Sequence, residues 1–445
     1  MNKPDALRPG RVTVGGAPEG YDAKRVADLA ARAEGPVIHV ARDDARAAAL
    51  RDALAIWAPG LPIFAFPAWD CLPYDRVSPN PEIAAERMAT LARLASRPPE
   101  APCVVVTTLN AATQRVPARE TVAEASFEGR VGHRVDVDGL TAWLARKGFN
   151  RASTVAEHGD YAIRGGIIDI FPPGSTNPVR LDFFGDVLES ARRFDASTQR
   201  TVAKIKRLSL APASEVILEQ ETIQRFRGRF RELFGAPRVD DPLYAAVSEG
   251  RKHQGMEHWL PLFHERLATL FDYLPEAPVT LDDQIDAALA ARAETVRDHY
   301  QARVEAAGIA NPGSLPVRPV PAAQLYLDEE AFAAALEGRT VHAFSPHRTS
   351  PGPGVIDAGG RQGRSFAPER QAETTNLFGA LAEHIRARLR EGPVVLASYS
   401  EGARDRLQGL LAEQGFHDVT QASDWRDLKP GLNLMVWALE AGFVA

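Results

Sequence analysis

Two glycines frame a segment whose spacing could bind phosphate. Gly15 and Gly20 enclose four residues in the order G-x-x-x-x-G, which in a phosphate loop is followed by Lys and then by Ser or Thr. In such loops the lysine reaches the β- and γ-phosphates and the hydroxyl holds magnesium. Here Tyr21 and Asp22 occupy those two positions, and a carboxylate repels phosphate. The sequence therefore predicts a degenerate, non-functional nucleotide loop, in which Gly20 makes a turn and Asp22 caps a helix beginning near Ala23.

A second segment carries polar and aromatic side chains on a predicted β-hairpin. An apolar run at 167–171, a Pro-Pro-Gly turn and the stretch 179–184 indicate two antiparallel strands. Because successive side chains alternate between the faces of a strand, one face of the return strand carries Arg180, Asp182 and Phe184. Leu181 and Phe183 lie on the other face, which we expect to contribute to a core. An arginine, a carboxylate and an aromatic ring together are typical of protein interfaces.

Other candidate clusters are better explained by structure than by catalysis. His264 and Glu265 lack the second histidine of a zinc-protease helix, and His253 and His258 have no further ligand nearby in the sequence. Ser400 follows a predicted strand and is interpreted as the cap of the next helix. We therefore expect no catalytic residues, no metal site and no cofactor.

A stretch rich in arginine and phenylalanine has two readings. Residues 225–231 contain four arginines separated by Phe226, Gly228 and Phe230, and this stretch could form a strip that binds nucleic acid. The simpler interpretation is a helix, with Phe226, Phe230 and Phe234 at a spacing of four facing inward and the arginines outside.

Composition narrows the class of protein. The 445 residues suggest several compact units, and 45% hydrophobic with 25% charged residues is ordinary for a globular protein. A net charge of −6 disfavours a surface built mainly to wrap nucleic acid. No apolar run approaches the ~20 residues of a membrane-spanning helix, and Cys71 and Cys103 form no CxxC pair or disulfide framework. We expect a cytoplasmic protein that does not bind membranes.

The order of predicted elements indicates an α/β chain with an insertion. Short apolar strands between amphipathic helices predict a parallel sheet in the first ~120 residues, followed by a small α+β unit of strands and turns. A proline-punctuated helical region comes next, and a strand at Val341–Ser345 is expected to rejoin the first sheet. The predicted boundaries are 1–123 for the first domain, 124–210 for the insert, 211–346 for the completion of the first domain, 347–364 for a linker and 365–445 for a small C-terminal α/β domain.

Several motifs together resemble those of one bacterial family. The longest is Glu157–Pro172 with its continuation Val179–Asp186. The others are Phe194-Asp195-x-x-x-Gln199-Arg200-Thr201, Phe66-Pro67-x-Trp69-Asp70-x-Leu72-Pro73-Tyr74, Thr107-Thr108-x-x-Ala111-x-x-Gln114-Arg115 and Gly255-Met256-Glu257-His258-Trp259-Leu260-Pro261-Leu262. Over nearly its whole length the chain resembles the N-terminal, UvrB-like region of the transcription-repair coupling factors (Mfd).

The resemblance implies a fold and a partner. The fold would be a degenerate P-loop, helicase-like sheet domain in two parts (1a and 1b), with the inserted domain 2 between them and a small domain 3 at the end. Domain 2 of this family binds UvrA through two arginines and a phenylalanine, which correspond here to Arg164, Arg180 and Phe184. The function implied is recruitment of UvrA to stalled RNA polymerase for nucleotide excision repair, by a module that has no working nucleotide site.

The resemblance also implies what lies outside this chain. Family proteins continue into a polymerase-interacting domain and an ATP-driven DNA translocase, so we expect an N-terminal fragment that is not itself an enzyme. RNA polymerase and DNA would be contacted through those further domains. A C-terminal domain of the full-length protein is expected to cover the UvrA-binding face until the motor engages DNA.

Alternatives remain open at this point. The chain could be an active UvrB-type excinuclease or helicase module that binds ATP and DNA, although Tyr21 and Asp22 argue against it. It could also be a purely structural scaffold, with an exposed hairpin that is incidental. For the three site residues, the alternative is that Arg164 and Arg180 merely pair with Asp182 or Asp160 on a sheet face and that Phe184 lies in the core.

Overall fold

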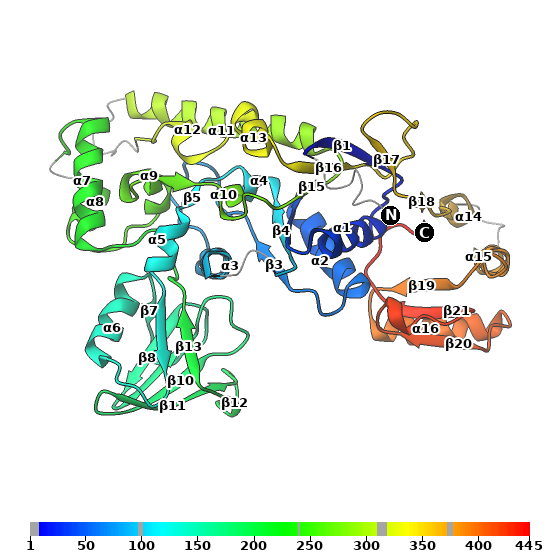
Figure 1. Ribbon diagram of the computed structural model, residues 1–445, viewed down its shortest axis with the longest axis horizontal. Helices are drawn as coiled ribbons and strands as arrows, with labels where there is room; N and C mark the ends of the chain where they lie inside the picture. The colour runs from blue at the N-terminus through cyan, green and yellow to red at the C-terminus, as the bar shows by residue number, and fades with distance from the viewer. Residues whose placement is uncertain (1–8, 97–100, 239–240, 309–317, 372–376) are drawn as a thin grey trace.

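The first domain is built on a seven-stranded parallel sheet. The computed structural model describes residues 9–96, 101–238, 241–308, 318–371 and 377–445. The strands of the sheet, from one edge to the other, are β17 (Val355–Asp357), β1 (Gly10–Gly15), β16 (Thr340–Phe344), β15 (Val279–Leu281), β2 (Pro36–Ala41), β4 (Cys103–Thr108) and β3 (Ile63–Phe66). All neighbouring pairs are parallel. The sheet combines β1, β2, β3 and β4, which come before the insert, with β15, β16 and β17, which come after it (Figure 1).

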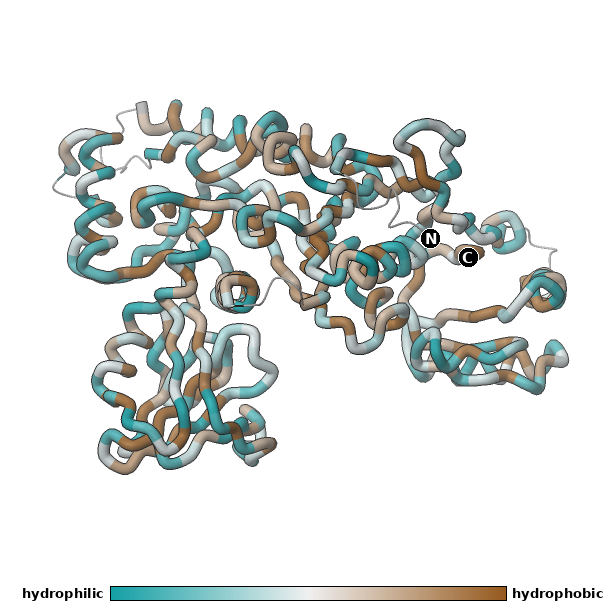
Figure 2. Tube along the Cα trace, in the orientation of Figure 1, coloured by the Kyte–Doolittle hydropathy of each residue, from teal (hydrophilic) through white to brown (hydrophobic). Residues whose placement is uncertain are grey.

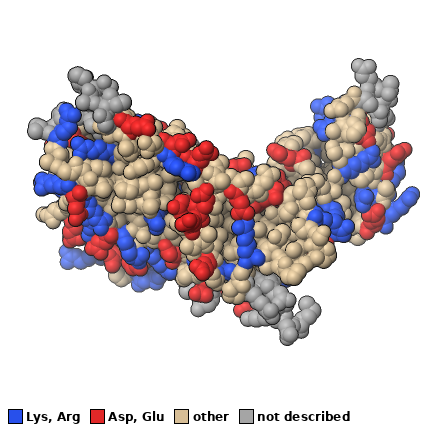
Figure 3. Space-filling model, turned by 90° about the horizontal axis from the view of Figure 1, so that it is seen from above, with Lys and Arg blue, Asp and Glu red and all other residues tan. Residues whose placement is uncertain are grey.

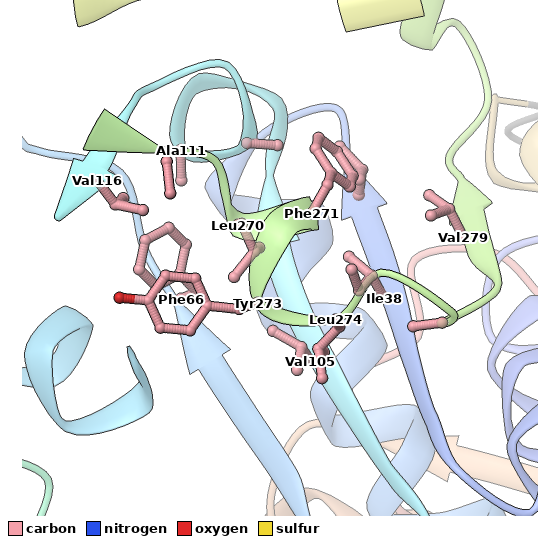
Figure 4. Packing of buried hydrophobic residues seen from close by; sticks show 14 of the residues in the cluster. Ile38, Phe66, Val105, Ala111, Val116, Leu270, Phe271, Tyr273, Leu274 and Val279 are labelled. Atoms are coloured by element: carbon pink, nitrogen blue, oxygen red, sulfur yellow. The ribbon is translucent and has the colours of Figure 1, made fainter. Parts of the chain in front are cut away.

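Both faces of this sheet are covered, because its central strands are apolar throughout. Every residue of β2 and β4 is buried. On one face, Val37 and Val104 pack with α1 (Tyr21–Ala33) and α2 (Asp44–Trp57). On the other face, Figure 4 shows Ile38 and Val105 among side chains of α10 (Leu270–Tyr273), close to α3 (Pro81–Ser96). Such continuous apolar strands are what a parallel sheet buried on both sides requires.

A second unit is inserted between β4 and β15. Its six-stranded sheet has the order β12 (Thr201–Ile205), β11 (Val187–Phe194), β10 (Val179–Phe184), β9 (Ile167–Ile170), β8 (Asp160–Arg164) and β7 (Asn150–Arg151). Neighbours are antiparallel except for the pair β7–β8. Leu140 and Leu144 of α6 (Val137–Arg146) pack on one face of the sheet. Hydrophobic and hydrophilic residues alternate along these strands (Figure 2), as expected for a sheet with one face on the core.

Two short pairs of strands connect the insert with the first domain. β6 (Phe127–Arg130) and β13 (Arg207–Leu210) pair at the base of the insert, and β5 (Val116–Pro117) pairs with β14 (Leu267–Ala268). The helices of these connections and of the region before β16 are α4 (Leu109–Ala112), α5 (Arg119–Glu124), α7 (Gln220–Phe234), α8 (Pro242–Ser248), η2 (Met256–Trp259), α9 (Leu260–Phe263), α11 (Ile285–Gly308), α12 (Ala322–Leu325) and α13 (Glu329–Leu336). Phe226 and Phe230 of α7 are buried, which confirms the structural interpretation of the arginine-phenylalanine stretch.

The C-terminal unit has a small parallel sheet of its own, in the order β19 (Val394–Ser398), β21 (Leu432–Val436) and β20 (Val419–Ala422). Its other elements are β18 (Arg361–Gln362), α14 (Ala367–Gln371), α15 (Leu377–Arg388), α16 (Glu401–Glu413), η3 (Trp425–Asp427) and β22 (Phe443–Val444). Ser400 caps α16 by accepting a hydrogen bond from the Ala403 amide, as predicted. β22 pairs with β18, and Phe443 of β22 packs against Tyr21 of the first domain.

The predicted fold class is confirmed: a parallel α/β domain, an antiparallel insert and a small C-terminal parallel sheet. Some local expectations were wrong. β1, β15 and β20 were not predicted, and β17, which joins the first sheet, lies within the residues predicted to be a linker. Among the described residues, no helix combines the length and the apolar character needed to cross a bilayer.

Candidate functional site

The remnant phosphate loop is occupied by the protein's own groups. It joins β1 to α1, and α1 begins at Tyr21 with Gly20 as its N-cap. The prediction that Asp22 caps a helix starting near Ala23 was therefore wrong. Instead, Asp22 lies inside the first turn, where its Oδ1 accepts hydrogen bonds from the amides of Gly20 (2.9 Å) and Ala23 (2.7 Å). Backbone amides at a helix N-terminus favour an anion, and this carboxylate supplies one.

A buried arginine neutralises that carboxylate. Nη2 of Arg46 lies 2.5 Å from Oδ2 of Asp22 and 3.3 Å from Oδ1 of Asp282. Burial raises the pKa of Asp22 to about 6, against the attraction of Arg46. Burial disfavours the charged form of Arg46 as well, but Asp22 and Asp282 outweigh it and raise the pKa of this guanidinium. The loop is thus an internal ion cluster in place of lysine, magnesium and phosphate.

Chain segments from the C-terminal side cover the same loop. The Tyr21 hydroxyl donates to the Ala358 carbonyl at 3.1 Å, and the Tyr21 ring packs against Phe443. A Cβ added to Gly20 would lie 2.8 Å from Leu439 Cδ2 and 2.9 Å from Phe443 Cε1. The residues present do not fit a nucleotide, because the loop glycines that would lie against phosphates are in contact with residues from the C-terminal side of the chain, such as Gly360 and Phe443.

The outer face of the inserted sheet brings the predicted hairpin residues together. Arg164, Ile167 and Asp182 are directly opposite one another across β8, β9 and β10, and so point to the same side. Arg180 and Phe184 lie two residues before and after Asp182 on β10 and share that side. From strand spacing and rise, Arg164 lies about 12 Å from both of them. The opposite face of β10 is buried at Leu181, as the alternation predicted.

Phe184 is the most exposed large apolar side chain in the described part of the molecule. Its exposed fraction is 75%, and it precedes Gly185, whose φ of 56° makes the turn into β11. The alternative in which Phe184 lies in the core was wrong. An apolar ring held out at the end of a hairpin is available to a partner.

Arg180 is already engaged within the insert. Its Nε and Nη2 donate to the two carboxylate oxygens of Asp169 at 2.6 and 2.8 Å, and Nη2 also donates to Oε1 of Gln199 at 2.9 Å. Its guanidinium carbon lies 4.6 Å from the centre of the Phe194 ring. The hydrogen bonds that Arg180 donates to Asp169 raise the pKa of this arginine above its ordinary value. The structure thus pairs this arginine with Asp169, and not with Asp182 or Asp160.

Arg164 has a different environment. It is exposed, and its Nη2 donates to the Ser153 carbonyl at 2.7 Å and to the Thr154 hydroxyl at 3.0 Å. Both acceptors are neutral, and within the described ranges no carboxylate lies within ion-pairing distance of it. Arg164 therefore contributes a positive charge that the insert does not neutralise.

Sequence reasoning missed the residues that hold Arg180. Asp169 is a lone carboxylate in the apolar run of β9, and the register places it directly opposite Arg180. Its alternation with Ile168 and Ile170, which are buried in the core, was a signal that it faces the other side. Phe194 and Gln199 come from the next hairpin, and no local pattern connects them with Arg180.

The geometry defines a class of protein: a parallel α/β domain whose loop between β1 and α1 is occupied by its own side chains, and which carries an inserted antiparallel domain. The family comparison agrees, since a model described as the UvrB interaction domain matches residues 128–216.

Comparison with curated proteins then identifies the relatives. The chain is homologous over most of its length to the transcription-repair-coupling factors. It is 32% identical to the Escherichia coli (strain K12) protein over 429 residues, which cover 94% of this chain and 35% of that relative. The Haemophilus influenzae protein is 39% identical over 49% of this chain and 19% of the relative, and the Bacillus subtilis protein 28% identical over 50% and 20%. The chain thus spans about a third or less of the length of these relatives.

Proposed function

We propose that this chain is an adapter that recruits UvrA through its inserted domain, in the service of transcription-coupled nucleotide excision repair. The observation that carries the proposal is the exposed ring of Phe184, on the same face as Arg164 and Arg180, within the segment that matches the UvrB interaction domain. Aromatic and arginine side chains dominate the binding energy of protein interfaces, which supports the assignment of these three residues as the contact.

The remnant loop supports a role in binding without catalysis. Asp22 stands where a phosphate loop has Ser or Thr and pairs with the buried Arg46, and the glycines of the loop pack against protein. We infer that the first domain supports the insert and does not hydrolyse ATP. RNA polymerase and DNA would be engaged by parts of the family protein outside this chain.

The test is the affinity of purified UvrA for this chain, measured by calorimetry. Phe184→Ala and Arg164→Ala should each weaken binding by about 2 kcal/mol, roughly 30-fold, because central anchors contribute at this level. The melting temperature should be unchanged, since both side chains are exposed.

Tyr399→Ala is the matched control for loss of an exposed aromatic side chain. Tyr399 is 70% exposed and lies in the C-terminal unit, so its replacement should leave UvrA affinity unaltered. Wild-type affinity in both hairpin variants, or an equal loss in the control, would exclude this face as the contact.

We further propose that a C-terminal domain of the full-length family protein restrains this face. The chain alone should then bind UvrA more tightly than the resting full-length protein does. Equal affinities of the two for UvrA would contradict the restraint, without affecting the assignment of the contact residues.

A further inference from the structure

We infer that Arg180 acts as a fixed hydrogen-bond donor, positioned by Asp169 and Gln199, and that Arg164 supplies a positive charge of the docking face that forms no ion pair with the described residues. This inference rests on the proposed function and adds two positioning residues to it. The partner group facing Arg180 would be a hydrogen-bond acceptor, such as a carbonyl or carboxylate oxygen.

The hydrogen bonds of Arg180 leave one edge of its guanidinium available. A guanidinium has five N–H donors, one on Nε and two on each Nη. Three of them are used, because Nε bonds Asp169 and Nη2 bonds both Asp169 and Gln199. For Nη1, no acceptor is found among the described residues, and 19% of the side chain remains exposed. The two Nη1 donors are therefore those that a partner can reach.

The orientation of this edge is fixed from two sides. Asp169 is almost fully buried, and its two parallel bonds to Arg180 define the plane of the guanidinium. Phe194 is 1% exposed and packs its ring against that plane. An arginine held in this way loses little conformational freedom on binding, which is how preorganisation raises affinity.

Gln199 is itself held in an unusual conformation. Its φ is 58°, in the left-handed region that residues other than glycine rarely adopt. Its Nε2 donates to the Ala196 carbonyl at 2.8 Å, so its Oε1 is the atom presented to Arg180. Asp195 braces the same turn by accepting from the amide and the hydroxyl of Thr198. A strained backbone that orients one acceptor is consistent with a positioning role.

The cations on this face differ in whether a carboxylate pairs with them. Asp169 neutralises Arg180, and Asp182 is paired with Arg192 at 3.0 Å. Arg164 has only neutral acceptors. The register places Lys204 opposite Arg192 on the same face, where it is exposed and forms no ion pair with any described residue. Long-range attraction of an acidic partner, which salt screens, should therefore depend on Arg164 and Lys204 and not on the Arg180–Asp169 pair.

The experiment is a double-mutant cycle on UvrA affinity with Asp169→Asn, Arg180→Gln and the double variant. Asp169→Asn should weaken binding about tenfold, as expected for loss of a bond that orients a charged donor. In the Arg180→Gln background, Asp169→Asn should not weaken UvrA binding further, because Asp169 acts on binding only through Arg180. A purely structural role would instead lower the melting temperature and leave the affinity of the folded protein unchanged.

Salt dependence and a second positioning variant complete the test. The double variant removes one charge of each sign, so binding should be weaker with an unchanged salt dependence, whereas Arg164→Gln should flatten the salt dependence.

Gln199→Gly relieves the backbone strain and removes the acceptor, and should weaken binding without loss of stability. Wild-type affinity in Asp169→Asn and Gln199→Gly overturns this inference alone, whereas failure of the unaltered chain to bind UvrA overturns the proposed function as well.

Discussion

At the scale of single residues, buried ion pairs join parts of the chain that are far apart in sequence. Arg87 of α3 is fully buried, and its Nε lies 2.5 Å from Oε1 of Glu215. The Arg87 guanidinium also lies over the Phe66 ring, 4.3 Å from its centre. Glu215 comes shortly after β13, where the chain returns from the insert. This pair therefore fixes the exit of the insert to the first domain.

Removing one partner of this pair should be costly. Arg87→Met leaves the Glu215 carboxylate buried without its cation, and should lower the free energy of unfolding by about 3–5 kcal/mol. Arg266→Met is the control, because Arg266 and Glu120 form an ion pair whose side chains are 62% and 64% exposed. An exposed pair contributes about 0–1 kcal/mol. Urea unfolding of both variants measures the difference, and equal losses would contradict the role of the buried pair.

The sequence predicted which hairpin residues share a face, but not their partners. The exposure of Phe184 and the burial of Leu181 follow from the two-residue repeat of a strand. The bond from Arg180 to Asp169 depends on strand register, and its contact with Gln199 depends on how the second hairpin folds over. Neither is encoded in local spacing.

At the scale of elements, strongly apolar or clearly bounded segments were the ones that could be predicted. β10 has the expected limits, and β16 is shifted by one residue from the expected strand Val341–Ser345. β15 has only three residues, and it is a strand because β16 and β2 lie on either side of it. The first two residues of β1 are exposed and the next two are half-buried, so its apolar pattern is weak. For these short strands the partners, and not the local sequence, decide the structure.

The contact between the remnant loop and the C-terminal segment can be tested at Gly20. Gly20→Val would place methyl groups against Leu439 and Phe443 and should displace the segment 437–443. The expected readouts are a red shift of tryptophan emission, because Trp437 and Trp57 pack together, and faster proteolysis of that segment.

Gly60→Val is the matched control for this substitution. Gly60 also has a positive φ, 97° against 90° at Gly20, but a Cβ there would have no atom within 4 Å. The free energy of unfolding should fall by about 1–2 kcal/mol in both variants, because valine is strained in this backbone conformation. An emission shift in both variants, or in neither, would refute the packing role of Gly20.

At the scale of the whole molecule, buried histidines couple stability to pH. Burial lowers the pKa of His39, His258 and His264 to about 4, from an ordinary value near 6.5. Between these values the unfolded state binds more protons, so the free energy of unfolding rises as pH increases. Between pH 5.5 and 7 each histidine should contribute about 1 kcal/mol to this rise in the free energy of unfolding. Asp22, whose pKa is raised to about 6, acts in the opposite direction and offsets part of this gain.

The urea midpoint should accordingly fall when the pH is lowered from 7 to 5.5. His264→Gln keeps a donor for the Glu215 carbonyl that Nε2 of His264 contacts at 2.8 Å, and should reduce the pH dependence. His133→Gln should not change it, because His133 is exposed. A pH dependence that is the same in His264→Gln and in the wild type would contradict this account.

The distribution of charge is in keeping with a partner-binding chain. On the face shown in Figure 3, Lys and Arg are interspersed with Asp and Glu instead of forming one basic band. Together with the net charge of −6, this disfavours wrapping of nucleic acid along that face. The inserted domain, by contrast, exposes the aromatic ring of Phe184 on the same face as Arg164, whose hydrogen-bond acceptors are neutral.

The ion cluster of Asp22, Arg46 and Asp282 has a consequence for movement. Motor domains change conformation as ATP is bound, hydrolysed and released, because the nucleotide binds one conformation better than another. Here the anion and its counter-charge are covalent parts of the chain, so occupancy never alternates. The first domain therefore has no cycle of anion uptake and release that could drive a change of shape, and the position of the insert does not depend on such a cycle.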